Sequence, residues 1–425
     1  MAYSTPITQA MVLPLPLEYS TATERGRDYN ISYKLTRQID EKQLEQLRDQ
    51  GFTAGLGKAL VDNTNISPLR IWIVDNSGSM SICDGKRFVV ETSRQEMIET
   101  VTCTRWNEIR ETVEYHARLA GLLHAPTTFR MLNDPGLGDG CQEFSICQRG
   151  KDMISQDIER AQNIMRKSTP RGTTPLTRHI REIRQDILAM ESSLVQEGKK
   201  VTLIIATDGL PTDGSGGGDD WEQRDFVEAL RSLEGLPVLI VVRLCTDDDD
   251  VVDFYDDLDS QLEMSVEVLD DFFSEAKRVH NHNKWVNYTL ALHRCREMGY
   301  NNRLLDLLDK RKLTRTELRD FCQLLLGNVM FDGVSDPEGD WKGFLHNLKI
   351  VLEKETLQYN PIAKRMMPLI AVEKWSDGRP RNMIIRRSVR VCNKRFNAAR
   401  EKMRLKLAGI LTRITNHHLR LCNTQ

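Results

Sequence analysis

Between about residues 67 and 280, short runs of apolar residues alternate with segments whose apolar residues recur at helical spacing. The apolar runs predict strands at residues 69–74, 128–132, 201–207, 238–244 and 265–269. The segments between them predict helices at residues 105–123, 152–167, 177–196, 220–233 and 250–258. Strands without polar alternation are typical of sheets that are buried on both faces. The pattern therefore predicts an α/β domain with a largely parallel central sheet.

The pattern changes after residue 280, where the strand signals stop. Thr314 and Glu317 have the spacing of a capping box, and Gly327 is a plausible helix end. Helices are predicted at residues 304–308, 316–326 and 341–352. We therefore expect an all-α region over residues 281–373.

Residues 1–66 are interpreted as an N-terminal extension, in which residues 39–48 predict a short polar helix. The segment from Gly55 to Lys58 partly resembles a phosphate-binding loop. That loop needs Gly and Ser or Thr where this chain has Phe52 and Ala59, and no strand precedes it. The segment is therefore not expected to bind a nucleotide.

The net charge of −2 hides a division of the chain into two parts. Residues 374–425 hold 14 Lys and Arg against two acidic residues, which gives this tail a charge of +12. The remaining residues hold 45 basic and 59 acidic side chains, a charge of −14. The tail is therefore a compositionally separate segment.

Apolar residues in the tail recur at helical spacing with Lys and Arg between them, which predicts a basic amphipathic helix. Such a helix can bind an anionic membrane surface or an acidic protein, or it can pack on the acidic body of the same chain. Nucleic-acid binding is disfavoured, because Phe396 is the only aromatic residue after Trp375.

Several other classes of protein are disfavoured. The nine cysteines form no CxxC pair, which argues against a disulfide scaffold or a zinc ribbon. His280, His282 and His293 lack the spacing of a helical zinc site and are expected at the surface, near a domain boundary. The first residues do not resemble a signal peptide, and no apolar run approaches the roughly 20 residues of a membrane helix. A cytoplasmic protein is expected.

Oxygen-bearing side chains follow the first predicted strand at alternate positions, in Asp75, Ser77 and Ser79. Thr174 lies in a turn that leads into a helix, and Asp208 follows the most apolar strand. A carboxylate and hydroxyls suit a hard cation such as Mg²⁺, which prefers six oxygen ligands, and do not suit zinc or copper. Ligands of open α/β sheets also bind at the carboxyl ends of strands.

Together, these three segments resemble the metal-ion-dependent adhesion site of von Willebrand factor type A (vWA) domains. That family has a DxSxS loop, a Thr in a Gly-x-Thr-Pro-like loop and an Asp in a Thr-Asp-Gly loop, in this order. The resemblance covers residues 67–280, about half of the chain. It implies a doubly wound, Rossmann-like α/β fold with a mostly parallel sheet.

The resemblance also implies a role for each residue. Ser77, Ser79 and Thr174 would bind Mg²⁺ (or Mn²⁺) directly, whereas Asp75 and Asp208 would act mainly through water molecules. Thr174 is chosen over the adjacent Thr173 because the family's Thr usually precedes the Pro-like position. This chain departs from the family at residues 80–103, an insertion expected beside the metal, and Gly214–Gly218 is expected on the same rim.

Intracellular vWA domains commonly serve as partner-binding modules. The resemblance therefore implies a non-enzymatic scaffold protein that recognises an Asp or Glu carboxylate of a protein partner. Two alternatives stay open. One is a vWA subunit of an ATP-driven complex whose ATPase is a separate chain. The other is a peripheral membrane protein that is bound through residues 374–425.

Overall fold

The computed structural model describes residues 38–91, 97–138, 140–212 and 220–375. The predicted tail helix and the loop Gly214–Gly218 lie outside these ranges. No helix among the described residues has both the length and the apolar character needed to cross a membrane.

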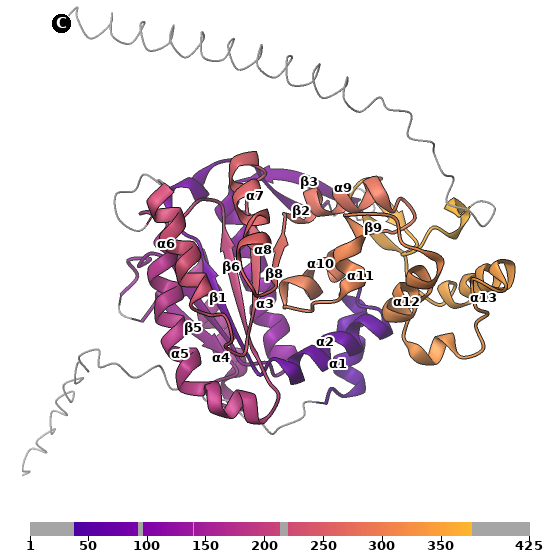
Figure 1. The fold of residues 1–425 in the computed structure, drawn as a ribbon, viewed down its shortest axis with the longest axis horizontal. Helices are drawn as coiled ribbons and strands as arrows, with labels where there is room; N and C mark the ends of the chain where they lie inside the picture. The colour runs from indigo at the N-terminus through magenta and orange to yellow at the C-terminus, as the bar shows by residue number, and fades with distance from the viewer. Residues whose placement is uncertain (1–37, 92–96, 139, 213–219, 376–425) are drawn as a thin grey trace, which may run out of the picture. The chain divides into compact units, whose positions relative to one another are not determined.

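A six-stranded sheet forms the centre of the molecule, with the strand order β5-β4-β1-β6-β7-β8 (Figure 1). All neighbouring strands are parallel except β5, which pairs with β4 in the antiparallel direction. The strands are β1 (Leu69–Val74), β4 (Thr127–Met131), β5 (Glu143–Ile146), β6 (Val201–Thr207), β7 (Val238–Leu244) and β8 (Val266–Leu269). The predicted α/β fold and largely parallel sheet are thereby confirmed.

Thirteen α-helices are assigned among the described residues. They are α1 (Glu41–Asp49), α2 (Ala54–Ile66), α3 (Arg105–Leu122), α4 (Ile154–Lys167), α5 (Leu176–Gln196), α6 (Asp220–Arg231), α7 (Asp249–Asp256), α8 (Leu258–Gln261), α9 (Phe272–His282), α10 (Leu290–Glu297), α11 (Arg303–Leu308), α12 (Arg315–Leu326) and α13 (Trp341–Leu352). The helices predicted between the strands are all present, with ends that differ by a few residues at most.

Helices cover both faces of the sheet because successive side chains of each strand point to opposite sides. Ile71 and Ile73 of β1 pack in the apolar core formed with α5, α6 and α7. Trp72 and Val74 pack on the other face with α3 and α4. Burial on both faces explains why β1 is apolar throughout.

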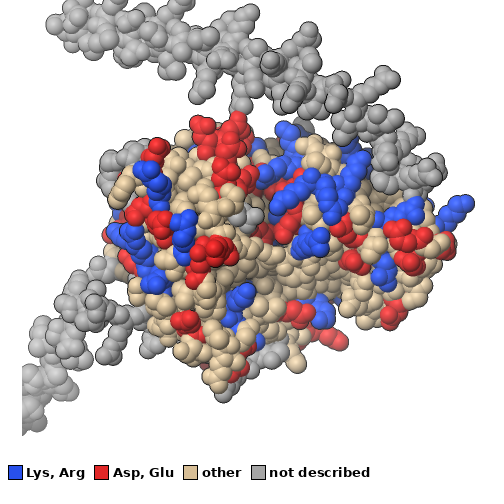
Figure 2. Space-filling view, in the orientation of Figure 1, with Lys and Arg blue, Asp and Glu red and all other residues tan. Residues whose placement is uncertain are grey.

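The acidic run at residues 247–250 begins α7, as its composition suggests. Asp248 is the N-cap, and its side chain accepts a hydrogen bond of 3.0 Å from the backbone N–H of Asp250. Figure 2 shows the acidic side chains gathered over α7. Carboxylates are favourable at this position because the helix dipole is positive at the N-terminus.

The region after residue 280 is not all-α. Its helices form as predicted, and the capping box of Thr314 and Glu317 is present. It also contains a short antiparallel hairpin of β9 (Gln358–Asn360) and β10 (Arg365–Met367). Strands of three residues are too short to show a period-2 pattern, which is why the sequence did not reveal them.

The glycine-containing segment at residues 54–66 is a helix, α2, and not a phosphate-binding loop. Gly55 lies where α2 approaches α12, and a Cβ atom at this position would lie 2.3 Å from the carbonyl oxygen of Leu324. The glycine therefore allows close packing of the N-terminal segment against the C-terminal region.

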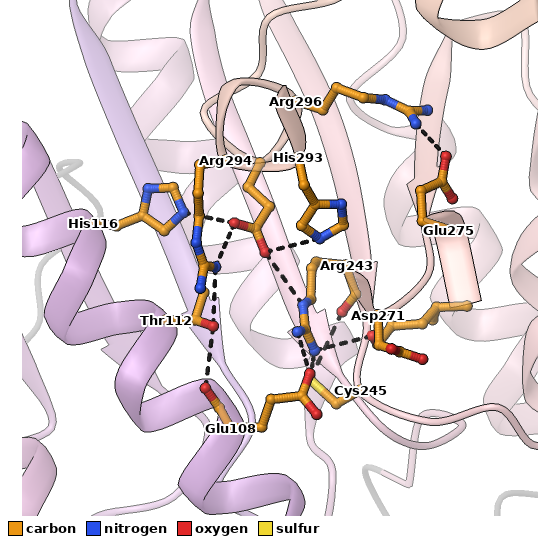
Figure 3. A network of polar contacts seen from close by, with 12 residues as sticks. Glu108, Thr112, His116, Arg243, Cys245, Asp271, Glu275, His293, Arg294 and Arg296 are labelled. Atoms are coloured by element: carbon orange, nitrogen blue, oxygen red, sulfur yellow. Dashed lines mark hydrogen bonds and ion pairs between the residues drawn. The ribbon is translucent and has the colours of Figure 1, made fainter. Parts of the chain in front are cut away.

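A buried polar network joins α10 to the sheet and to α3 (Figure 3). Its centre is the carboxylate of Glu297, which lies 2.9 Å from His116 Nε2, 2.6 Å from Arg294 Nη1 and 3.4 Å from Arg243 Nε. His293 Nε2 lies 3.4 Å from the same carboxylate. His293 is fully buried, so its expected surface position is wrong. Contacts of this network cross residue 280, where a domain boundary was expected.

Replacement of Glu297 by Gln should lower the free energy of unfolding by on the order of 3 kcal/mol, because the buried Arg243 and the partly buried Arg294 would lose a shared counter-charge. Urea denaturation measures this effect. The matched control is Glu353→Gln at an exposed position, for which a change within about 0.5 kcal/mol is expected. Equal effects of the two substitutions would show that the network contributes no stability.

The stability contributed by neutral His116 should depend on pH. Burial lowers the pKa of His116 to about 4, and the Glu297 carboxylate only partly opposes this shift. The unfolded chain takes up the proton near the ordinary pKa of about 6.5, so acid favours unfolding through this group between pH 6.5 and 4. The stability difference between the wild type and His116→Gln should shrink by about 2 to 3 kcal/mol between pH 7 and pH 4.5. A difference that stays constant with pH would contradict this assignment.

Candidate metal site

The parallel pairing of β1 with β6 brings the predicted site residues together at one edge of the sheet. Val74 lies opposite Ala206 in the register, and the backbone N–H of Asp75 donates a hydrogen bond of 2.9 Å to the carbonyl of Ala206. Asp75 and Asp208 therefore follow neighbouring strands at the same edge. This is the edge at which ligands of open α/β sheets bind.

The carboxylate of Asp75 is fully buried. Its Oδ1 accepts a hydrogen bond of 2.8 Å from the backbone N–H of Ser77, and its Oδ2 accepts one of 2.6 Å from Thr207 Oγ1. Burial, and after it the nearby Asp208 carboxylate, raises the pKa of Asp75 to about 6. A bound dication would oppose both effects and favour the ionised form.

The hydroxyl groups of the DxSxS loop converge. Ser77 Oγ lies 3.0 Å from Ser79 Oγ, and Ser79 Oγ donates a hydrogen bond of 2.8 Å to Asp208 Oδ1. Two neighbouring ligands of an octahedral Mg²⁺, each at about 2.1 Å, lie about 3 Å apart. The two hydroxyls are hydrogen-bonded to each other, and their separation is also the one at which both would bind a single Mg²⁺.

Thr174 lies in a loop that is hydrogen-bonded to both of the other segments. The N–H of Gly78 donates to the carbonyl of Gly172 at 3.1 Å, and the N–H of Thr174 donates to Thr212 Oγ1 at 2.8 Å. A Cβ atom at Gly209 would lie 3.9 Å from Thr174 Oγ1. Thr174 is buried and Thr173 is exposed. Thr174 is thus the threonine that faces the protein interior at this junction.

The donor set of the site consists of hydroxyls and two carboxylates, which suits Mg²⁺ or Mn²⁺. Over the described ranges, no group of three or more His, Cys, Asp or Glu side chains is placed to hold a metal ion. Ser77, Ser79 and Thr174 would supply direct ligands, and Asp75 and Asp208 would orient them and balance the charge. A metal held mainly by neutral hydroxyls would attract an additional anionic oxygen ligand.

Two positioning residues were not identified from the sequence. Asn76 exchanges hydrogen bonds with the backbone of Asn133, at 2.9 Å through its Nδ2 and 2.8 Å through its Oδ1. Arg105 donates from Nη1 to Asp208 Oδ2 at 2.9 Å. Asn76 lies within the DxSxS motif, so its position next to the site could have been predicted from the sequence. Arg105 is 26 positions beyond Ser79 in the chain and has no motif to mark it.

The insertion at residues 80–103 lies beside the site, as expected. Its described part forms an antiparallel hairpin of β2 (Gly85–Glu91) and β3 (Met97–Cys103), which the sequence analysis did not predict. The hairpin is fastened to α3, since the N–H of Lys86 donates to Glu108 at 2.9 Å. Asp84, just before β2, binds Arg105, which reaches the site. The insertion is therefore connected to the site by the Asp84–Arg105–Asp208 contacts and by the backbone N–H groups of Met80 and Ile82, which donate to the carbonyls of Ser77 and Ser79.

No protein-family profile matches this chain, and no curated protein matches it by sequence.

Replacement of Asp75 by Asn should lower the affinity for Mn²⁺ at least tenfold, because the substitution removes half of the site's carboxylate charge. Titration with Mn²⁺, followed by the paramagnetic resonance signal of the free ion, measures the dissociation constant. Asp62→Asn on the exposed face of α2 is the matched control and should bind as the wild type does. If Asp75→Asn also binds Mn²⁺ as the wild type does, the ion is bound elsewhere.

Proposed function

We propose that this chain is a vWA-type protein that binds Mg²⁺ or Mn²⁺ through Asp75, Ser77, Ser79, Thr174 and Asp208. The observation that carries the proposal is the 3.0 Å separation of the Ser77 and Ser79 hydroxyls at the shared edge of β1 and β6. Three separate loops contribute to this edge in the order of the family's motif. The six-stranded sheet with helices on both faces agrees with the fold of that family.

The proposed activity is recognition of a protein partner and not catalysis. The donors are hydroxyls held by hydrogen bonds, and Asp75 is enclosed by Ser77 and Thr207. Neither arrangement supplies an exposed general base or an activated nucleophile. A metal that retains an exchangeable position would instead accept a carboxylate from an Asp or Glu side chain of the partner. We propose that the protein acts in this way as an intracellular scaffold.

The test is a pull-down with the full-length protein as bait in Mg²⁺ buffer, in EDTA, and in Mg²⁺ buffer with an Asp75→Ala bait. The specific partner should be present only with the wild-type bait in Mg²⁺, and readdition of Mg²⁺ after EDTA should restore it. The Asp62→Ala bait controls for loss of a surface carboxylate. Identical bound proteins in every lane would refute metal-dependent recognition.

A further inference from the structure

A buried guanidinium group lies between the candidate metal site and the inserted hairpin. Arg105, the first residue of α3, is 8% exposed. Its Nη1 donates to Asp208 Oδ2 at 2.9 Å. Its Nε and Nη2 donate to the two oxygens of Asp84 at 2.7 and 2.6 Å. Arg105 therefore bridges a carboxylate of the site and a carboxylate of the insertion.

Two hydrogen bonds fix the start of α3 and therefore the position of Arg105. The backbone N–H of Arg105 donates to the carbonyl of Ile82 at 3.0 Å, and the preceding Thr104 caps α3 by accepting a hydrogen bond from Asn107. The N-terminus of α3 adds the positive end of an 18-residue helix dipole near the site. Asp84 fixes the planar guanidinium by a two-point contact, which favours one orientation.

The charges of the site explain what this arginine does. Asp75 and Asp208 supply two negative charges, and both side chains are fully enclosed. Arg105 neutralises one of them. A dication bound beside Asp75, Asp208 and Arg105 therefore leaves these groups with one net positive charge. Asp84 compensates Arg105 only partly, because its side chain is 40% exposed and water screens its charge. An interior of low dielectric strengthens the remaining repulsion between Arg105 and the metal.

We propose that Arg105 is a specificity-determining residue that makes metal binding depend on an anionic ligand. It weakens the binding of the metal alone and strengthens the complex of the metal with a carboxylate. The inference rests on the metal site of the proposed function and adds a reason why that site would prefer an anionic ligand to a neutral one. A carboxylate neutralises the remaining positive charge, whereas a neutral amide or hydroxyl of a partner does not.

The experiment measures the Mn²⁺ dissociation constant of the full-length protein from the resonance signal of free Mn²⁺. Titrations are made in chloride, in acetate at equal ionic strength, and with acetamide, the neutral analogue of acetate. In the wild type, acetate should lower the dissociation constant and acetamide should not. In Arg105→Gln, binding in chloride should strengthen by on the order of tenfold, and the effect of acetate should largely disappear.

Three further variants separate charge from structure. Arg105→Lys keeps the positive charge and should retain the acetate effect. Arg87→Gln, on the same hairpin and paired with Glu111, makes the same substitution away from the site and should behave as the wild type does. Asp84→Asn leaves Arg105 charged but uncompensated, so Mn²⁺ binding in chloride should weaken. Because Asp84 is partly exposed, this variant tests the proposal even if Arg105→Gln does not fold.

The outcomes distinguish this inference from the function on which it rests. Wild-type protein that binds no Mn²⁺, or binds it equally well as Asp75→Asn, would overturn the metal site itself. Wild-type protein that binds Mn²⁺ at this site, with unchanged or weaker binding in Arg105→Gln, would overturn only the role of Arg105. Equal behaviour of Arg105→Gln and Arg105→Lys would overturn it as well, because charge would not be the cause. Stronger Mn²⁺ binding in Asp84→Asn would also contradict the charge argument.

Discussion

The parallel register of β1 and β6 is the constraint on which the candidate site depends. With Val74 opposite Ala206, Asp75, the first residue after β1, comes within hydrogen-bond distance of Thr207, the last residue of β6. A shift of one residue would turn every side chain of β1 to the opposite face of the sheet, and the two apolar cores oppose it. Packing on both faces of the sheet therefore determines the positions of the oxygens of the candidate site.

The site brings two carboxylates together at low exposure, and the chain moderates their repulsion in three ways. Hydrogen bonds from the N–H of Ser77 and the hydroxyl of Thr207 stabilise the Asp75 carboxylate. Its raised pKa allows it to hold a proton when no cation is near. Arg105 stabilises the Asp208 carboxylate. Arg105 thus contributes to the charge balance of the site, although it lies outside the sequence motifs that identified the site.

The segments outside the central α/β region are packed as parts of the same unit. Glu297 from α10 is the shared acceptor for side chains of α3 and β7, and Gly55 lets α2 approach α12 closely. A buried carboxylate with several donors is costly to separate from them, because each partner left behind would lose its counter-charge. The inserted hairpin is likewise held against α3 and reaches the site through Asp84.

The sequence by itself determined the strands of the parallel sheet, the helices between them and the residues of the candidate site. The strands and helices are local features, because burial on two faces gives apolar runs. The residues of the candidate site were identified because three short motifs, far apart in the chain, resemble those of a known family. The sequence did not determine the hairpins or the burial of His293. It also did not reveal that Arg105 contacts Asp208. Such contacts join residues far apart in the chain, here 103 positions apart, and leave no periodic pattern. Only tertiary packing decides which charged side chain meets which partner.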